Sequence, residues 1–526
     1  MNRSKENRKS FQTRPTIWLW PILLIAAYFR LSDLAIKPPH FDEGINGHFV
    51  LTLWRDGFYT YDPSNFHGPL YFYLLHLAEV IFGRGVESFR IMNAFLAIGL
   101  VAFLFQFRRF VGGAAVWAAA MVAVSPAFTF YGRYAIHETL FILGQVAFVY
   151  GRLLWMQRPS RDSIYCMTAG LVVLLATKET FFIFVGTWFI AEFVVYWSER
   201  LHAWIQRHSE SPEQPAPWSR LGELSTLEMQ GLVRAAWVAT SLAVFTTLAL
   251  FTGFFENPKG AGDFVRAFDF WSKTGNDGNG HGKEMAYWIK TMWRYEWLLC
   301  MGLAVGALAA LPFRWGNRAQ RVLLLTGFGS FLAYSIIHYK TPWLLLSFWS
   351  LFFFMIPRLR RGLWKPVIAL LLLVSLVHDA RQAWDLNFHK FADSSEPYVY
   401  VQTTSDYSKV MDVLQRKIKE APDTKNAVIL IMVQDPWPLP YDVALFPNLK
   451  YSKLEDIDRN LDLLKQADLI LADGSHLEGL RKVFPKKFGR MRFQLRDAYE
   501  SGWALFDFEK FQPVLSGDVE LEEPAR

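Results

Sequence analysis

The sequence predicts a polytopic α-helical membrane protein that carries a soluble α/β domain at its C-terminal end. Of its 526 residues, 52% are hydrophobic and only 20% are charged, below the roughly 25% of charged residues in soluble domains. The apolar residues gather in blocks of near membrane-spanning length between Ile17 and Ala380. The chain that follows is polar, so we expect a transmembrane domain over 1–384 and a separate domain over 385–526.

Apolar blocks of about 17–22 residues match the hydrocarbon thickness of a bilayer. The segment 70–83 is shorter and amphipathic, which is typical of a helix lying in the membrane interface. No small-residue cleavage site follows the apolar run Ile17–Ala27, so we expect a retained first helix. The blocks predict about eleven transmembrane helices, near 16–35, 90–107, 111–131, 137–155, 163–177, 180–197, 231–254, 296–312, 321–338, 341–356 and 365–381.

Basic residues predict the orientation, because cytoplasmic loops are enriched in Lys and Arg. A basic run between Arg3 and Arg14 precedes the first helix, which places the N-terminus in the cytoplasm. Alternation then puts the short basic loops on that side as well, with Arg108, Arg109, Arg152, Arg158, Arg161, Arg314, Arg318, Arg321, Arg358, Arg360, Arg361 and Lys365. We therefore expect a multi-pass protein of the plasma (inner) membrane, with a cytoplasmic linker at 198–230 and outer loops at 36–89 and 255–295.

The same alternation places the tail 385–526 outside the membrane. Its runs NAVILIMV, ADLILAD, RFQL and WALFDF have the composition of strands, and LEDIDRNLDLLKQ has a helical pattern. This mixture predicts a small α/β domain.

Composition also argues against several classes of function. The net charge is +7, but the basic residues stand between apolar blocks, so we do not expect nucleic-acid binding. The two cysteines, Cys166 and Cys300, lie in or beside apolar blocks, which argues against a disulfide framework and a cysteine metal site.

Ionisable residues gather at the predicted outer ends of the helices. A charge buried among helices is costly unless it is paired, so such residues often mark a site. A structural interpretation competes with this one: Lys178 and Lys340 reach the interface, His338 caps a helix, and Arg133 pairs with Glu138. The residues concerned are His40, Asp42, Glu43, His48, His67, Arg133, His137, Glu138, Lys178, Glu179, His338 and Lys340.

Together these residues suit the chemistry of an anionic phosphate and a nucleophile that must lose a proton. A divalent metal site at His40, Asp42 and Glu43 is an open alternative, because hard cations favour carboxylate and imidazole ligands. The spacing fits no strong metal motif, so no cofactor is assigned.

Several of these residues stand in motifs that resemble the large GT-C membrane glycosyltransferases, which include the protein mannosyltransferases and the lipid A aminoarabinose transferases. The motifs are HFDEGINGHF, FHGPLYFYLLHLAEVIFGRGVESFRIMNAFLAIG, SPAFTFYGRYAIHETLF, ATKETFF and YKTPWLLL. A closer resemblance, on YKTPW, YVYVQTTSDY and QDPWPLPY, is to a subfamily found in archaeal N-glycosylation gene neighbourhoods and some bacteria. The resemblance covers nearly the whole chain and implies a GT-C-like fold.

The resemblance implies a transferase that uses a polyprenyl-phosphate-linked sugar on the extracytoplasmic side. Asp42 matches the catalytic aspartate, expected to be the general base, with Glu43 beside it. His67 stands where a lysine often meets the donor phosphate, and a histidine is cationic only if its pKa is raised. The other residues expected to bind the donor are Arg133, Glu138, Lys178, His338 and Lys340.

The expected partners are the bilayer, the donor lipid and an acceptor that is a lipid, a glycan or a protein. Two other functions stay open, a component of a lipid-linked sugar flippase and a non-catalytic scaffold for glycan assembly. Two loops complete the predictions. The loop 434–441 (QDPWPLPY) suits sugar binding or closure onto the membrane part, and the Gly-rich loop 272–285 suits a lid or a plain connector.

Overall fold

The computed structural model describes residues 16–65, 67–206, 224–277, 281–310, 317–355, 364–433, 435–444, 446–453, 461–496, 501–511, 519–522 and 524. The chain forms two compact units. The first, called here the helical unit, comprises Met1–Leu34, Thr52–Gly83 and Ser88–His389. The second, called the sheet unit, comprises Ala35–Leu51, Arg84–Glu87 and Lys390–Arg526.

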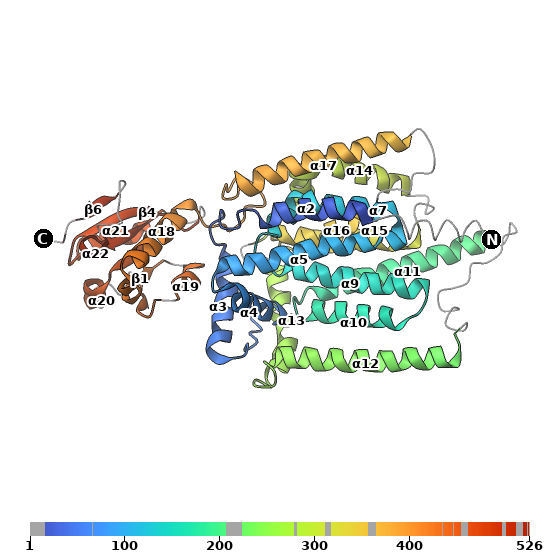
Figure 1. Ribbon diagram of the computed structural model, residues 1–526, viewed down its shortest axis with the longest axis horizontal. Helices are drawn as coiled ribbons and strands as arrows, with labels where there is room; N and C mark the ends of the chain where they lie inside the picture. Colours follow the sequence, from blue (N-terminus) through green and yellow to red (C-terminus); the bar gives the residue numbers. More distant parts are fainter. Residues whose placement is uncertain are drawn as a thin grey trace. The chain divides into compact units, whose positions relative to one another are not determined.

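Long apolar helices that lie side by side form the body of the helical unit (Figure 1). In the described part of the chain, four are long and apolar enough to cross a bilayer, namely Val86–Val111, Glu138–Gln157, Phe181–His202 and Thr226–Phe251. The helices of this body include α5 (Val86–Gln106), α9 (Glu138–Gln157), α10 (Arg161–Leu175), α11 (Phe181–Gln206), α12 (Thr226–Phe251), α14 (Tyr287–Ala310), α15 (Arg318–Ile336) and α17 (Trp364–Phe388).

Other predicted spans are shorter or interrupted. The helices α2 (Leu19–Leu31) and α4 (Leu70–Phe82) are short and apolar. The predicted span 111–131 is divided into α7 (Gly113–Val124) and α8 (Pro126–Tyr131). The division falls at Ser125, which is extended with ψ 129° because the proline that follows disfavours helical backbone there.

The span expected at 341–356 is also not one continuous α-helix. It opens with a 3₁₀ turn, η3 (Pro342–Leu345), before α16 (Leu346–Phe352). A multi-pass helical architecture is thus confirmed, whereas the number eleven stays a prediction.

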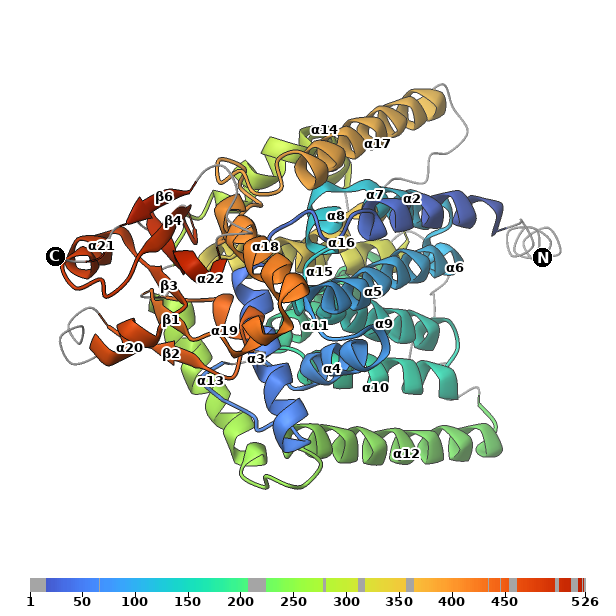
Figure 2. The ribbon, with the colours of Figure 1, turned by 60° about the vertical axis from the view of Figure 1, so that its left-hand side comes forward.

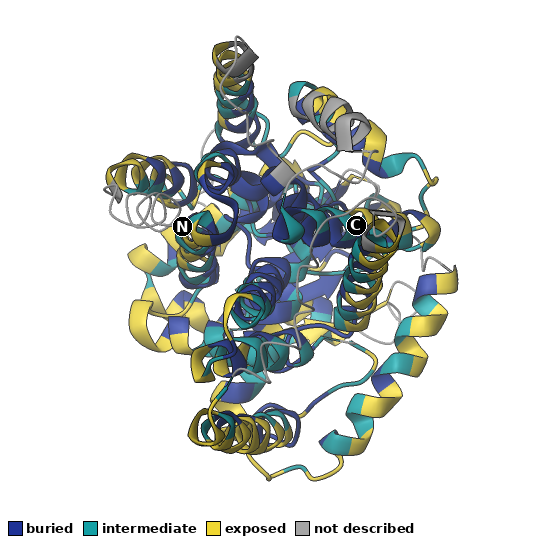
Figure 3. Ribbon diagram, turned by 90° about the vertical axis from the view of Figure 1, so that its right-hand side faces the viewer, coloured by how far each residue is buried: buried dark blue, intermediate teal, exposed yellow. Residues whose placement is uncertain are grey.

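The outer helices of the helical unit expose apolar side chains. Figure 3 shows peripheral helices with exposed faces and central helices that are buried. Only 22% of the apolar window of α12 is buried, against 61% for α9. On α12 the exposed side chains include Trp237, Leu242 and Phe245. Apolar side chains around a bundle are stable in contact with lipid, so this burial pattern fits a membrane domain.

The loop predicted at 255–295 is largely helical. The amphipathic helix α13 (Gly260–Asp277) continues through the first part of the Gly-rich segment. Residues 278–280 lie outside the described residues, and Gly282 then forms a β-bridge with Tyr339. The end of the Gly-rich segment is therefore held at the YKTPW motif. Whether the segment also acts as a lid stays a prediction.

The sheet unit contains a mixed six-stranded sheet in the order β2-β1-β3-β5-β4-β6 (Figure 2). The strand β1 is parallel to β2 and β3, and β5 is antiparallel to β3 and β4. The strands are β1 (Ile429–Met432), β2 (Leu449–Tyr451), β3 (Leu469–Ala472), β4 (Phe488–Phe493), β5 (Gly502–Asp507) and β6 (Glu520–Glu522). The α/β tail predicted from the sequence is present.

Alternating side chains of the buried strands supply two cores. Ile429 and Ile431 face the core that contains α18 (Ser405–Glu420), whereas Leu430 and Met432 face the core that contains α21 (Gly474–Arg481). Strands buried on both faces are apolar at every position, which explains the runs ILIM and LILA. The helix predicted between them is α20 (Leu461–Gln466), and residues 454–460 are outside the described part.

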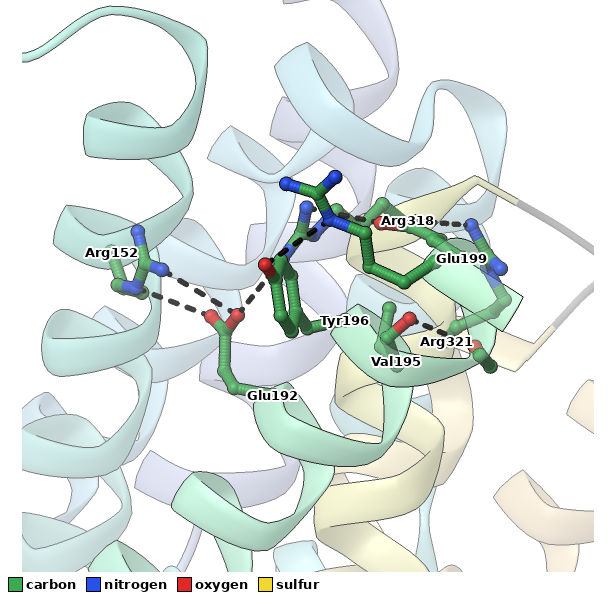
Figure 4. A network of polar contacts seen from close by, with 9 residues as sticks. Arg152, Glu192, Val195, Tyr196, Glu199, Arg318 and Arg321 are labelled. Carbon is green, nitrogen blue, oxygen red and sulfur yellow. Dashed lines mark hydrogen bonds and ion pairs between the residues drawn. The ribbon is translucent and has the colours of Figure 1, made fainter. Parts of the chain in front are cut away.

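Arginines of the predicted cytoplasmic loops form an ion-pair network (Figure 4). Glu192 of α11 pairs with Arg152 at 3.2 Å and with Arg318 at 3.5 Å. Glu199, about two turns further along the same face of α11, pairs with Arg318 at 3.1 Å and Arg321 at 2.7 Å. The network therefore ties α9, α11 and α15 together, a role that the charge pattern of the loops alone does not show.

We expect Glu192→Gln to lower the apparent Tm of the purified protein, because the largely buried guanidinium of Arg152 loses its carboxylate and Arg318 keeps only its pair with Glu199. Leaving a buried charged group without its partner costs about 1–3 kcal/mol. The matched control is Asp269→Asn on α13, whose pair with Lys273 is exposed on both sides (67% and 66%), so it should change stability by less than about 0.5 kcal/mol. Equal melting curves for both variants and the wild type would contradict the role of the network.

Candidate functional site

The acidic stretch that stands out in the sequence forms the first turn of α3 (Phe41–Asp56). His40 precedes this helix, and its Nδ1 accepts a hydrogen bond from the backbone N–H of Asp42 at 3.1 Å. Its Nε2 therefore carries a proton and donates it to the carbonyl of Tyr400 at 2.7 Å. The ring caps the helix in one tautomer, with both nitrogens engaged.

Glu43 completes the cap from the other direction. It is fully buried, and its Oε2 accepts a hydrogen bond from the backbone N–H of His40 at 2.9 Å. This is the reciprocal half of a capping box. The geometry therefore supports a structural role for Glu43 beside Asp42.

Asp42 differs from its neighbours. Its side chain is half-buried, and within the described residues its carboxylate makes no hydrogen bond or ion pair. It lies in the first turn of α3, where the helix dipole favours a negative charge. Burial, and then the charge of Asp42, raise the pKa of the nearby Tyr400 phenol. Asp42 is thus the carboxylate of this stretch that is available to a ligand.

The metal alternative finds little support in this geometry. In the chain as far as it is described, no group of three or more His, Cys, Asp or Glu side chains is arranged to hold a metal ion. A cation bound by His40 and Glu43 would have to displace their capping hydrogen bonds. His48 is exposed and lies edge-on to Trp437, with ring centroids 5.5 Å apart.

A second polar group lies in the helical unit, where the segment around His67 pairs with the connection from α10 to α11. His67 forms a β-bridge with Lys178. Gly68 N–H donates to the carbonyl of Thr177 at 2.9 Å. A Cβ on Gly68 would clash with the carbonyl of Ala176, so the close approach of the two segments requires glycine.

Lys178 and Glu138 form a buried ion pair at this point. The Nζ of Lys178 bonds to Oε1 of Glu138, and the two side chains are only 8% and 3% exposed. The pair joins the first turn of α9 to the α10–α11 connection. The sequence suggested Arg133 as the partner of Glu138, whereas the structure pairs Glu138 with Lys178. The reason is the backbone pairing of Lys178 with His67, which brings Lys178 to Glu138.

His67 presents an acceptor rather than a cation. Its Nδ1 lies 2.6 Å from the carbonyl of Asn65, and a carbonyl only accepts, so Nδ1 carries the proton. Burial, and then the charge of Lys178, lower the pKa of His67 to about 3. At neutral pH the ring is uncharged and its Nε2 carries a lone pair. That atom repels a phosphate oxygen, so the geometry does not support His67 as a phosphate ligand.

Glu179 is buried beside the ion pair. Its Oε1 accepts a hydrogen bond from the Tyr61 hydroxyl at 2.7 Å. Burial is the main cause that raises the pKa of Glu179, to about 7. His137 also lies here, with its ring centroid 4.3 Å from that of His67 and 4.5 Å from that of Tyr71.

Arg133 is engaged in holding the end of α2. Its Nη1 donates to the carbonyls of Phe29 at 3.0 Å and Ser32 at 2.6 Å. Its Nη2 donates to the carbonyl of Asp33 at 2.7 Å. The last carbonyls of a helix need donors of this kind. The geometry therefore favours a structural role over phosphate binding for Arg133.

Lys340 and His338 also lie at a helix end. The Nζ of Lys340 donates to the carbonyl of Ile337, just after α15, and to that of Lys283 at 3.2 Å. Burial lowers the pKa of Lys340. His338 offers its backbone carbonyl to Lys283 N–H at 3.3 Å, while its side chain is exposed. Both residues hold the end of the Gly-rich segment in place.

The buried acids Glu296 and Asp379 were not among the site residues predicted from the sequence. Glu296 lies at a non-helical residue (φ −129°, ψ 37°) inside α14, and its carboxylate accepts hydrogen bonds from Ser125 and Trp349. Asp379 of α17 is also fully buried, with Nδ1 of His378 at 3.0 Å. Both acids stand inside predicted spans, and a charge within a span is the signal that points to such residues.

We compared the chain with known protein families, sequences and structures, and only the structures show a similarity. No protein-family model matches the chain, and no curated protein sequence is similar to it. Its structure is similar to that of ArnT from Cupriavidus metallidurans bound to undecaprenyl phosphate, at 12% identity and a TM-score of 0.58, with 96% of this chain and 100% of that chain covered. This likeness shows a GT-C fold and confirms the fold implied by the motifs.

Two further structures are similar at lower scores. ArnT from Cupriavidus metallidurans in the apo state matches at 12% identity and a TM-score of 0.49, covering 95% of this chain and 99% of that chain. The arabinofuranosyltransferase AftD from Mycobacteria matches at 13% identity and a TM-score of 0.45, covering 93% of this chain and 39% of that chain.

The buried carboxyl of Glu179 predicts a pH-dependent stability. Its pKa is about 7 in the folded protein and about 4.3 in an unfolded chain, so the folded state binds the proton more tightly. Its contribution to stability is lost as the pH rises from about 4.3 to 7. Glu179→Gln keeps an acceptor for the Tyr61 hydroxyl but does not titrate. We therefore expect the apparent Tm of Glu179→Gln minus that of the wild type to increase as the pH is raised from 5 to 8.

The control is Glu256→Gln at an exposed position of the connection between α12 and α13, which should follow the wild type at every pH. Melting curves of the purified proteins across this pH range measure the effect. A difference between Glu179→Gln and the wild type that stays constant with pH would contradict the assignment.

Proposed function

We propose, for a chain with a GT-C fold, that the protein is a membrane glycosyltransferase. It moves a sugar from a polyprenyl-phosphate-linked donor to an acceptor on the extracytoplasmic face. The observation that carries the proposal is the unengaged carboxylate of Asp42 at the first turn of α3, beside residues whose polar atoms are used in capping. A carboxylate held in a fixed helix and left available is suited to take a proton from a ligand.

In the proposed reaction Asp42 is the general base. The acceptor hydroxyl or amine attacks the anomeric carbon of the sugar, and its proton passes to the Asp42 carboxylate. The bond between the anomeric carbon and the phosphate oxygen breaks at the same time, and the electron pair leaves with the polyprenyl phosphate. The acceptor thereby gains the glycosidic bond, and the donor becomes free lipid phosphate.

Lys178 is the cation that we assign to the donor phosphate. It is the lysine buried beside His67 and Glu138, and in a desolvated site such a charge stabilises a leaving phosphate strongly. ArnT, which shares the fold, was solved with undecaprenyl phosphate bound. Glu138 holds Lys178 in place, whereas His67, Arg133 and Lys340 serve structure in this proposal. A polyprenyl phosphate is soluble in the bilayer, so its head group lies near the membrane surface.

One observation favours a second function, a component of a lipid-linked sugar flippase. Transporters place charged residues at interruptions of transmembrane helices, and Glu296 lies at such an interruption in α14. Reconstitution of the purified protein in liposomes separates the two functions. A transferase consumes a donor supplied from one side in the presence of acceptor, whereas a flippase moves the intact donor across.

We expect Asp42→Asn to abolish transfer, because an amide cannot take the proton in the transition state. Removal of a general base lowers the rate by about 10²–10⁴-fold. The assay is release of undecaprenyl phosphate from a panel of synthetic undecaprenyl-phosphoryl hexoses and pentoses by the full chain in its native membranes, which supply the acceptor. The matched control is Asp56→Asn at the exposed end of the same helix, which should keep wild-type activity. Full activity of Asp42→Asn would rule out the assignment.

We expect loss of Lys178 to weaken binding of undecaprenyl phosphate at least tenfold, because about 1.4 kcal/mol of charge attraction corresponds to that factor. The variant is Lys178→Met combined with Glu138→Gln, so that no unpaired charge stays buried. Titration of the purified full chain with undecaprenyl phosphate measures the affinity, with the exposed Lys259→Met as control. Wild-type affinity of the double variant would contradict the role of Lys178.

A further inference from the structure

The segment that leads into α3 is tied to the start of the tail domain, far away in the sequence. Gln402 Nε2 donates to the carbonyl of Pro38 at 2.9 Å, and Thr403 Oγ1 donates to that of Pro39 at 2.6 Å. His40 forms a β-bridge with Gln402. Together with the bond from His40 to Tyr400, these contacts fix every residue from 38 to 40 within the sheet unit.

The tail segment Tyr400–Thr403 makes these contacts in a strained conformation. Val401 has a positive φ of 54°, which is rare for a β-branched residue and costs about 1–3 kcal/mol. It stands between Tyr400 and Gln402, the residues that hold the helix cap. Strain of this kind persists where the surrounding contacts determine the conformation, and it is common at functional sites.

The loop Asp435–Tyr441 packs against one side of the first turns of α3. A Cβ on Gly44 would clash with the backbone of Pro438, and a Cβ on Gly47 would clash with the ring of Tyr441. At about 100° per residue, Gly44 and Gly47 lie about 200° and 140° around the helix from Asp42. The loop therefore contacts the side of α3 that is opposite to Asp42.

Arg496 joins this loop to the start of the helix. It is 2% exposed, and its Nη1 donates to the carbonyl of Trp437 at 2.8 Å. Its Nη2 donates to Asp435, to the carbonyl at 3.0 Å and to Oδ2 at 2.7 Å. The guanidinium also lies 4.8 Å from the ring centroid of Phe41, the residue before Asp42.

We infer that the C-terminal α/β domain positions the proposed general base: the loop Asp435–Tyr441, held by Arg496, sets the rotation of the Asp42 helix through its glycine side. The inference rests on the proposed function of Asp42. A general base acts only within hydrogen-bonding reach of the proton that it takes, and a displacement of about 1 Å costs about 10²-fold in rate. Gly44, Gly47 and Arg496 are positioning residues in this arrangement, and the Tyr441 ring is the surface that a side chain at position 47 would meet.

Gly47→Ala tests the inference, because the added methyl group must push the helix away from the Tyr441 ring. With the undecaprenyl-phosphoryl sugar that the wild type uses, we expect kcat to fall at least tenfold while KM for the donor stays within twofold. The matched control is Gly186→Ala on α11, where a Cβ meets nothing within 4 Å, and its kcat should equal that of the wild type. Combining Gly47→Ala with Tyr441→Ala removes the clash and should restore most of the lost kcat.

Rates are expressed per folded molecule, from the amplitude of the melting transition. Thr403→Val deletes the hydrogen bond to Pro39 and the longer one, 3.3 Å, that Thr403 Oγ1 accepts from Gln402 Nε2. It is the milder second variant if Gly47→Ala folds poorly, and it should also lower kcat with KM for the donor unchanged. Wild-type kcat of these variants, or a double variant as slow as Gly47→Ala, overturns the inference. If Asp42→Asn is active, the proposed function fails; if it is inactive while Gly47→Ala has wild-type kcat, the positioning inference alone fails.

Discussion

The buried ion pair between Lys178 and Glu138 is the interaction on which the arrangement of the helical unit's polar residues depends. Taking two charges out of water is costly, and their attraction repays that cost only with good geometry and further hydrogen bonds. Here the backbone pairing of Gly68 with Thr177 supplies the geometry. The ion pair and this backbone bond together join three segments, which contain Gly68, Glu138 and Lys178. In the proposed function a lipid phosphate and Glu138 would both interact with the charge of Lys178.

Other positively charged side chains at the helix ends form hydrogen bonds to backbone carbonyls and thereby stabilise the fold. Arg133 donates to carbonyls at the end of α2, and Arg30 donates to carbonyls of Val122 and Ala123. Carbonyls at helix ends need donors, and inside a bilayer the protein itself has to provide them. A count of arginines near a predicted rim therefore overestimates the charge available to a phosphate, whereas a lysine paired with one carboxylate remains a candidate.

The apolar blocks and the strand composition of the tail could be predicted because they follow from local pattern and burial. The interruption before Pro126, which the predicted span 111–131 missed, could have been predicted in the same way, since proline restricts the residue before it. The contacts of Pro38 and Pro39 with Gln402 and Thr403 could not, because they join segments more than 360 positions apart. The same holds for the tautomer of His67, which depends on one carbonyl that the fold brings to it.

The two acids inside predicted spans constrain the choice between transfer and transport. Glu296 accepts hydrogen bonds from Ser125 and Trp349, so the interruption of α14 is stabilised by donors of its own bundle. In the described part of the chain, neither Glu296 nor Asp379 is paired with Lys or Arg. A carboxylate held in this way is satisfied without a passing ion, which favours a structural reason for the kink. Asp379, which lies 3.0 Å from Nδ1 of His378, is therefore the residue that a transport function would have to use.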